Sequence, residues 1–117
     1  GVASYAVGNL FIADALNHRI RRVDVSTGII TTVAGNGVRG YLDDGVVATT
    51  TQLNAPNGVA VDAAGNLFIA DSGNHRIRRV DAGTNFISTV AGNGTRGEGG
   101  EGARLPAQNC LSLRTWR

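Results

Sequence analysis

The chain has 117 residues, 42% of them hydrophobic, and its 11 basic and 9 acidic side chains give a formal charge of +2. This charge is too small to indicate a polyanion as partner, and the abundance of Val, Ile, Thr and Gly over Lys, Met and Glu argues against a helical protein. The single cysteine, Cys110, excludes an intramolecular disulfide, and no apolar run is long enough to cross a bilayer.

The sequence contains no methionine and has no basic-then-apolar segment at its N-terminus. We therefore expect an excerpt or a processed piece of a longer protein, with any targeting signal outside it. The compartment stays open, and a secreted or cell-surface bacterial origin is one expectation.

One stretch of sequence occurs twice. Residues 8–24 read GNLFIADALNHRIRRVD and residues 65–81 read GNLFIADSGNHRIRRVD, with a constant spacing of 57 residues. The copies differ only where Ala15 and Leu16 are replaced by Ser72 and Gly73. A fixed period of this size is typical of solenoids, propellers and other repeat arrays.

Each copy is predicted to form four short strands separated by turns. Asp62 and Gly65 occupy the ends of a type I turn, whereas Gly73 and Asn74 are expected to supply positive φ angles in the next turn. Because short hairpins force antiparallel neighbours, each copy should be a four-stranded meander. The predicted strands are 2–3, 10–14, 18–23 and 29–34 in the first copy, and 59–62, 67–71, 75–80 and 86–91 in the second.

The apolar run at 67–70 predicts a sheet that is buried on both faces, as in meanders stacked around an axis. The expected fold class is therefore all-β, with two four-stranded antiparallel blades of a β-propeller. Two blades cannot close a ring, so we expect a partial propeller or an assembly of chains. The Arg-rich third strand of each blade is expected to lie toward the outside, with its guanidinium groups in water.

The blades divide the chain into three parts. Residues 1–57 hold the first blade and a long connector from residue 35, and residues 58–104 hold the second blade with the start of a similar connector. Residues 105–117 form a divergent tail, in which a weak final strand is expected around 111–115.

Repeated polar residues follow the second strand of each copy, and they allow two readings. An Asp and a His in this position could bind a metal or act as general base, or they could build the turn. Repetition favours the structural reading, because a catalytic group is needed once whereas a blade-building group recurs in every blade. The predicted structural residues are Asp14, Asn17, His18, Arg19, Asp71, Asn74, His75 and Arg76.

No catalytic, cofactor-binding or metal-binding residue is predicted. A metal in a propeller channel needs His, Asp or Glu on the innermost strands, which offer only Asp62, beside a turn. Asp43 and Asp44 match no calcium-loop spacing, so a solvated loop is expected there.

Two basic clusters remain as a candidate binding surface. They could face phosphates, but aromatic residues are sparse, and Asp24 and Asp81 stand beside them to form ion pairs. We favour a solvated, ion-paired blade edge and expect no nucleic acid. The residues concerned are Arg21, Arg22, Arg78 and Arg79.

The segments NLFIAD and NHRIRRVD resemble the NHL repeat, the blade unit of NHL β-propellers, and the resemblance covers residues 1–108. The connector sequences AGNG and QLNAPNGVAVD resemble long-repeat bacterial members. Tyr5 in place of Asp62, and Leu16 in place of Gly73, depart from the second copy. The resemblance implies a platform that binds proteins, RNA or extracellular ligands, and in a minority of similar propellers a lyase or lactone hydrolase with a metal in the central channel.

We therefore expect a non-catalytic binding module that needs no cofactor. A fragment of a propeller enzyme is the alternative, and RNA binding through the Arg clusters ranks below it. A protein or a small ligand is the expected partner. Three two-bladed chains forming one six-bladed ring are the expected assembly if the chain is not a fragment.

Overall fold

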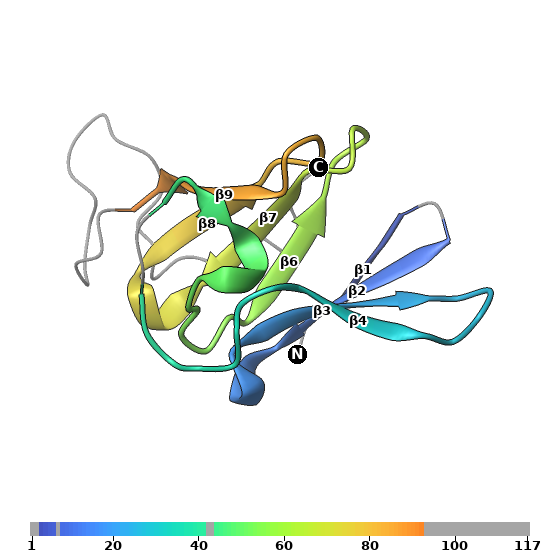
Figure 1. The fold of residues 1–117 in the computed structure, drawn as a ribbon, viewed down its shortest axis with the longest axis horizontal. Coiled ribbons are helices and arrows are strands. Elements are labelled where there is room, and N and C mark those ends of the chain that lie inside the picture. Colours follow the sequence, from blue (N-terminus) through green and yellow to red (C-terminus); the bar gives the residue numbers. More distant parts are fainter. Residues whose placement is uncertain (1–2, 7, 42–43, 93–117) are drawn as a thin grey trace.

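A computed structural model describes residues 3–6, 8–41 and 44–92 and shows an all-β chain with two antiparallel sheets. Figure 1 shows the two sheets side by side, with the first in blue to cyan and the second in green to orange. The first sheet has the order β1 (Ala3–Ala6), β2 (Asn9–Asp14), β3 (Arg19–Asp24) and β4 (Ile30–Ala34). The second has the order β5 (Val46–Val47), β9 (Phe86–Ala91), β8 (Arg76–Val80), β7 (Leu67–Asp71) and β6 (Gly58–Val61).

The predicted four-stranded meander is present in both copies. Each copy also has a register shift at the same place in its third hairpin, between Ile20 and Arg21 and between Ile77 and Arg78. No helix in the described ranges is long and apolar enough to cross a membrane. The predicted final strand and the tail lie outside the described residues.

The connector contributes a fifth strand to the second sheet, which the prediction of four strands missed. β5 pairs with the outer strand β9 through Val46↔Ile87 and Val47↔Phe86, and the short 3-10 helix η2 (Ala48–Thr50) follows it. The parts of the connector before and after β5 are also joined, because Gly40 N–H donates to Leu53 O at 3.1 Å. A two-residue strand leaves no periodic pattern in a sequence, so only the structure identifies it.

The first hairpin differs between the copies. The Asp62 side chain accepts hydrogen bonds from the backbone N–H groups of Ala64 (3.0 Å) and Asn66 (2.9 Å), and so organises the predicted turn. The first copy has Tyr5 in that position, and its β1 pairs one residue out of step, with Ala3 opposite Ile12 where Val59 faces Ile69. The strand accordingly covers Ala3–Ala6 rather than the predicted 2–3.

The corner between the second and third strands also differs from the expected turn. Residues Ala15–Asn17 and Ser72–Asn74 form 3-10 helices, η1 and η3. The positive φ angles that we expected at Gly73 and Asn74 occur instead at the next residue, 54° at His18 and 55° at His75. A left-handed histidine thus ends each 3-10 turn and redirects the chain into the third strand.

The core lies between the two sheets. Alternation along β7 sends Leu67 and Ile69 toward the first sheet, where they join one apolar cluster with Phe11 and Ile20 and with Leu53 of the connector. Phe68 and Ala70 point to the other face of the second sheet and belong to a separate cluster with Ile77 and Ala91. The predicted burial on both faces is therefore present at Leu67, Ile69 and Ala70, with Phe68 partly buried.

Candidate binding groove and connector contacts

The connector joins the two sheets through two neighbouring backbone amides. Asn54 N–H donates to Asp71 Oδ1 at 2.8 Å, and Ala55 N–H donates to His18 Nδ1 at 3.0 Å. The acceptors stand at equivalent corners of successive copies: Asp71 ends the second strand of its copy, and His18 follows the 3-10 turn of the other. One turn of the connector therefore fixes both sheets, and Ala55 adopts a positive φ of 49° to present its amide.

Asp71 is the centre of a buried polar network. Its Oδ2 accepts hydrogen bonds from Asn74 Nδ2 at 2.8 Å and from Arg78 Nη1 at 3.0 Å, and both the Asp71 and Arg78 side chains are fully buried. Burial raises the pKa of Asp71, while the hydrogen bonds from Asn54, Asn74 and Arg78 act in the opposite direction. Asn74 also donates to Gly40 O at 2.7 Å, which ties the network to the connector.

The expectation of a solvent-facing Arg78 is wrong. Its second guanidinium nitrogen binds Asp44 Oδ1 at 3.0 Å, and the guanidinium lies 4.8 Å from the centre of the Tyr41 ring. Arg76 stacks on the same ring at 3.9 Å. Asp44 also accepts the N–H of Thr89 at 3.0 Å, so at this residue the loop is bonded to the second sheet and is not the solvated loop that we predicted. Asp43 lies outside the described residues.

In the part of the chain that the structure describes, the equivalent pair of the first copy has no such connector contacts and is more exposed. Arg21 Nη1 stands 3.7 Å from Asp14 Oδ2, and each of these side chains is 28% exposed, against 0% for Arg78 and Asp71. Asn17 Nδ2 closes the corner by donating to Asp14 Oδ2 at 3.0 Å. Arg19 lies opposite Asp14 in the ladder, as Arg76 lies opposite Asp71.

The last two candidate arginines have different partners. Arg79 Nη2 pairs with Asp81 Oδ1 at 3.2 Å, as the sequence indicated. Asp24, the equivalent acid in the first copy, instead accepts Ser26 Oγ at 2.7 Å and Ser26 N–H at 3.0 Å. Among the described residues the Arg22 side chain has no hydrogen bond or ion pair within 4 Å. Its charge still acts on Asp24 at longer range and, after the hydrogen bonds from Ser26, helps to lower the pKa of that carboxyl.

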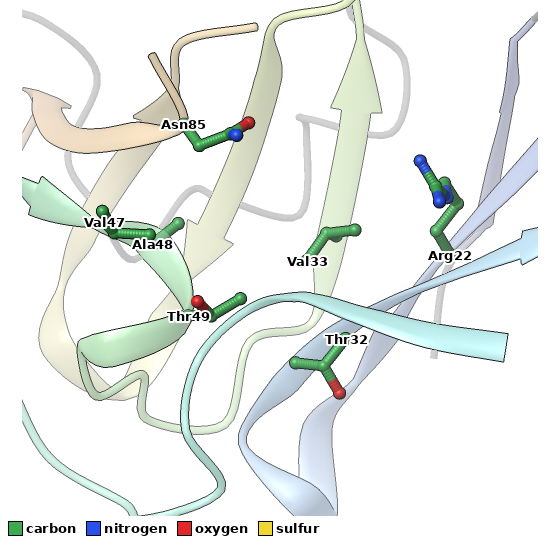
Figure 2. A pocket seen from close by; sticks show the side chains of 7 residues that line it. All are labelled: Arg22, Thr32, Val33, Val47, Ala48, Thr49 and Asn85. Carbon is green, nitrogen blue, oxygen red and sulfur yellow. The ribbon is translucent and has the colours of Figure 1, made fainter.

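Arg22 lies at the junction of two hollows between the sheets. One, of about 230 Å³, and the other, of about 190 Å³, share Arg22, Val33 and Asn85 in their walls, and we call the pair the inter-sheet groove. In Figure 2, Arg22, Thr32 and Val33 come from the first sheet, and Val47, Ala48, Thr49 and Asn85 stand opposite them. The second hollow is lined by Phe11, Gly65, Leu67, Val80 and Ala82 besides the shared residues.

The groove can bind but has little means to catalyse. It offers one guanidinium, one amide and two hydroxyl groups over an apolar floor, and its lining contains no carboxylate, imidazole or thiol. No group of three metal-binding side chains exists among the described residues. Sequence reasoning included Arg22 but missed Asn85, Thr32 and Thr49, because the groove arises where β4 meets a connector segment with no regular pattern.

Comparison with known proteins identifies the repeat. Residues 53–80 match the NHL repeat. The chain is 37% identical over 81 residues to protein SUPPRESSOR OF QUENCHING 1, chloroplastic, of Arabidopsis thaliana, a match that covers 69% of this chain and 8% of that protein. It is 34% identical over 82 residues to human NHL repeat-containing protein 2, of which it covers 11%. The chain thus spans about a tenth of these relatives.

Solved structures share the fold. An auxiliary nutrient binding protein from Bacteroides thetaiotaomicron matches 81% of this chain and 26% of its own with a TM-score of 0.61 at 23% identity. A protein of unknown function from the same organism matches 90% of this chain and 40% of its own, with a TM-score of 0.54 at 18% identity. These structures support the fold alone, whereas the match of residues 53–80 and the relatives of 34–37% identity show that the chain belongs to the NHL repeat family.

Proposed function

We propose that this chain is a non-catalytic binding module, built from two β-propeller blades of a larger protein, and that its inter-sheet groove holds an anionic group of a peptide or protein. The observation that carries the proposal is the exposed guanidinium of Arg22 between two hollows, with no hydrogen bond or ion pair within 4 Å among the described residues. An exposed guanidinium at the edge of a groove can form a charge-assisted hydrogen bond with a carboxylate that enters the groove.

The lining of the groove supports a ligand that is both acidic and apolar. Thr32, Thr49 and Asn85 supply neutral donors and acceptors around Arg22, while Val33 and Leu67 supply apolar surface. Sites for small ligands and peptides combine an apolar floor with few polar groups in this way. Because no acidic side chain lines the groove, nothing in its walls repels a carboxylate.

The two alternatives from the sequence have less support. The four candidate arginines do not form one surface for RNA, because Arg78 is buried and Arg79 is paired with Asp81. For a channel-metal enzyme, the described residues provide no observation that favours such a site.

A pair of short peptides tests the proposal. Titration of the isotope-labelled full chain with a blocked Leu-Glu dipeptide should shift the NMR signals of Arg22, Thr49 and Asn85, and the Leu-Gln counterpart should not. Arg22→Ala should weaken the binding about 10-fold or more, because a charged hydrogen bond contributes roughly 1.5–3 kcal/mol.

Arg79→Ala is the matched control, since Arg79 occupies the equivalent position in the second copy but is held by Asp81. Its binding should equal that of the unchanged chain. Ser26→Gly should weaken binding as well, because it frees Asp24 to pair with Arg22. Equal binding by the Arg22→Ala chain would refute the proposal, and a tighter, salt-dependent interaction with single-stranded RNA would favour the alternative.

A further inference from the structure

Two Asn-Gly dipeptides in the described part of the chain lie in different structural settings. Asn36-Gly37 forms a bend at the start of the connector, and its asparagine is exposed. Asn57-Gly58 leads into strand β6, where the glycine is buried. In an Asn-Gly dipeptide the asparagine side chain condenses readily with the next backbone nitrogen, because glycine has no Cβ to obstruct the ring that forms. The third such dipeptide, Asn93-Gly94, lies outside the described residues.

The Asn36 side chain is folded over the peptide that follows it. Its Oδ1 accepts the Val38 N–H at 2.9 Å, and this Asx turn closes a ring that contains the Gly37 nitrogen. The donated N–H polarises the side-chain carbonyl and would stabilise the negative oxygen that forms when Cγ is attacked. Gly37 has φ 88°, a conformation that glycine adopts without strain. The bend therefore keeps both reacting groups close together.

A guanidinium covers Gly37 in this bend. A Cβ added at Gly37 would collide with the Arg19 side chain and lie 2.9 Å from Arg19 Cζ. Among the described residues Arg19 has no ion pair, and Asp14, opposite it in the ladder, is paired with Arg21 instead. A nearby positive charge favours the anionic form of a group, so Arg19 favours loss of the Gly37 amide proton and formation of the oxyanion on Asn36.

Asn57-Gly58 is held away from the same reaction. The Asn57 N–H donates to Ala70 O at 3.1 Å, and its Oδ1 accepts the Ser72 hydroxyl at 2.7 Å. Gly58 lies opposite Ala70 in the pairing of β6 with β7. Both residues of the dipeptide are thus fixed to the neighbouring strand and corner, and the ring can close only after β6 has separated locally from β7.

We propose that Asn36-Gly37 is a site of spontaneous backbone modification, which converts Asn36 into aspartate and isoaspartate while Asn57 stays unchanged. The Gly37 nitrogen loses its proton to solvent and attacks Asn36 Cγ, so that a new N–C bond forms and Nδ2, protonated by solvent, leaves as ammonia. Water then opens the succinimide ring at one of its two carbonyl groups and restores a backbone N–H and a carboxylate. Nothing is oxidised or reduced, and water is the co-reactant.

The products change the connector in two ways. Each adds a carboxylate close to the Arg19 guanidinium and lowers the formal charge of +2 by a single unit. Isoaspartate also adds a methylene group to the backbone between Gly35 and Gly40. The N–H groups of these glycines are fixed to Ala48 O (2.9 Å) and Leu53 O (3.1 Å), so the extra length lies between two anchored points. The modification is a slow, one-way change, and it does not depend on the ligand proposed for the inter-sheet groove.

Peptide mapping of the aged full chain tests the proposal. Trypsin cleaves after arginine, so the three Asn-Gly dipeptides fall in the separate peptides 23–39, 40–76 and 80–96. After incubation at neutral pH, peptide 23–39 should show the mass gain of an amide-to-acid conversion and react with an isoaspartyl methyltransferase. In the folded chain Asn36 should convert about 10-fold or more faster than Asn57, which must first open locally. In denaturant the two should convert at similar rates.

Variants of Arg19 test the contribution of the guanidinium. Arg19→Gln should slow the conversion of Asn36 about 3-fold or more, whereas Arg19→Lys, which keeps the charge, should retain most of the rate. Asn36→Gln is the blank for peptide 23–39, because its longer side chain would have to close a larger ring. Circular dichroism checks that each variant is folded, and the comparison of Asn36 with Asn57 needs no variant.

Three results would count against the proposal. Conversion of Asn57 as fast as that of Asn36 in the folded chain would show that the fold does not select between them. A slower conversion of Asn36 in the folded chain than in denaturant would show that the bend protects the side chain. Either result overturns the assignment of the site, and an unchanged rate in a folded Arg19→Gln chain overturns the role given to Arg19.

Discussion

At the scale of the residue, the two copies act as controls for each other. Arg21 and Arg78 have the same neighbours in sequence, and Asp14 and Asp71 differ only in the two residues that follow them, yet one member of each pair is partly exposed and the other is fully buried. The buried pair is bound by Asp44 and Asn54 of the connector. A residue's role in this chain depends on which segment packs against its copy.

Gly73 shows this dependence most sharply. Its N–H donates to Asn54 O at 2.8 Å, and an added Cβ would stand 2.7 Å from that oxygen and collide with the Asn54 side chain. Leu16 holds the same place in the first copy and is 91% exposed.

We predict that Gly73→Ala lowers the free energy of unfolding by about 1–3 kcal/mol, because the connector must move away. Leu16→Ala should change it by less than about 0.5 kcal/mol, as is usual for exposed positions. Chemical denaturation of the two variants measures both values. Similar effects of the two substitutions would show that Asn54 does not constrain this corner.

At the scale of the element, β5 closes the edge of the second sheet. Ala48 N–H donates to Asn85 O at 2.9 Å and Gly45 N–H donates to Ile87 O at 2.8 Å, on either side of the pairing of Val46 and Val47 with β9. In the described residues β4 has no such partner, and it remains an edge strand of the first sheet.

Proline substitutions test the contribution of β5. Ala48→Pro removes the donor to Asn85 and enlarges a fully buried side chain, so it should lower the free energy of unfolding by roughly 2–3 kcal/mol. Val47→Pro is the control, because Val47 already has φ −62° and is partly exposed. Its effect should stay below about 1 kcal/mol by the same denaturation experiment, and an equal loss in both variants would contradict this account.

The repeated strands could be predicted from the sequence, whereas the repeated 3-10 corners η1 and η3 and the elements that occur once could not. The strands, their order and the turn at Asp62 follow from the apolar runs, the short turns and the duplicated motif. β5 and η2 lie in a connector without a second described copy to compare. The burial of Arg78 depends on Asp44 and Tyr41, which are far away in the sequence and carry no signal of that contact. The inter-sheet groove was missed for the same reason, since its walls meet only in the folded chain.

At the scale of the whole molecule, acid should destabilise the fold through its turns. Hydrogen bonds from Asn66 lower the pKa of Asp62, those from Ser26 lower the pKa of Asp24, and those from Thr84 lower the pKa of Asp81. A carboxylate with a lowered pKa in the folded state adds stability above its ordinary pKa of about 3.9 and loses that contribution as the pH falls through the folded value. Asp71 acts in the opposite sense, because burial raises its pKa.

We therefore predict that Asp62→Ala destabilises the chain at pH 6 and has a smaller effect at about pH 2.5, because the carboxylate takes up protons as the pH falls toward its lowered pKa. Thermal unfolding at the two pH values measures the difference. Asn66→Ala removes a donor to Asp62 Oδ2, so it should also reduce the dependence of the unfolding temperature on pH. If Asp62→Ala destabilises the chain equally at both pH values, the negative charge of the Asp62 carboxylate does not stabilise the turn.

The exposed Leu16 has a consequence for self-association. An interface that fits head to tail, without closing on itself, produces open filaments. At Gly73 an added side chain would collide with Asn54 of the connector, so leucine at the equivalent position 16 prevents Asn54 of a second copy from packing on the first corner in the same way. The Leu16 side chain is itself exposed. One side chain therefore makes this corner a poor receiver for the connector of another copy, and so disfavours that head-to-tail contact.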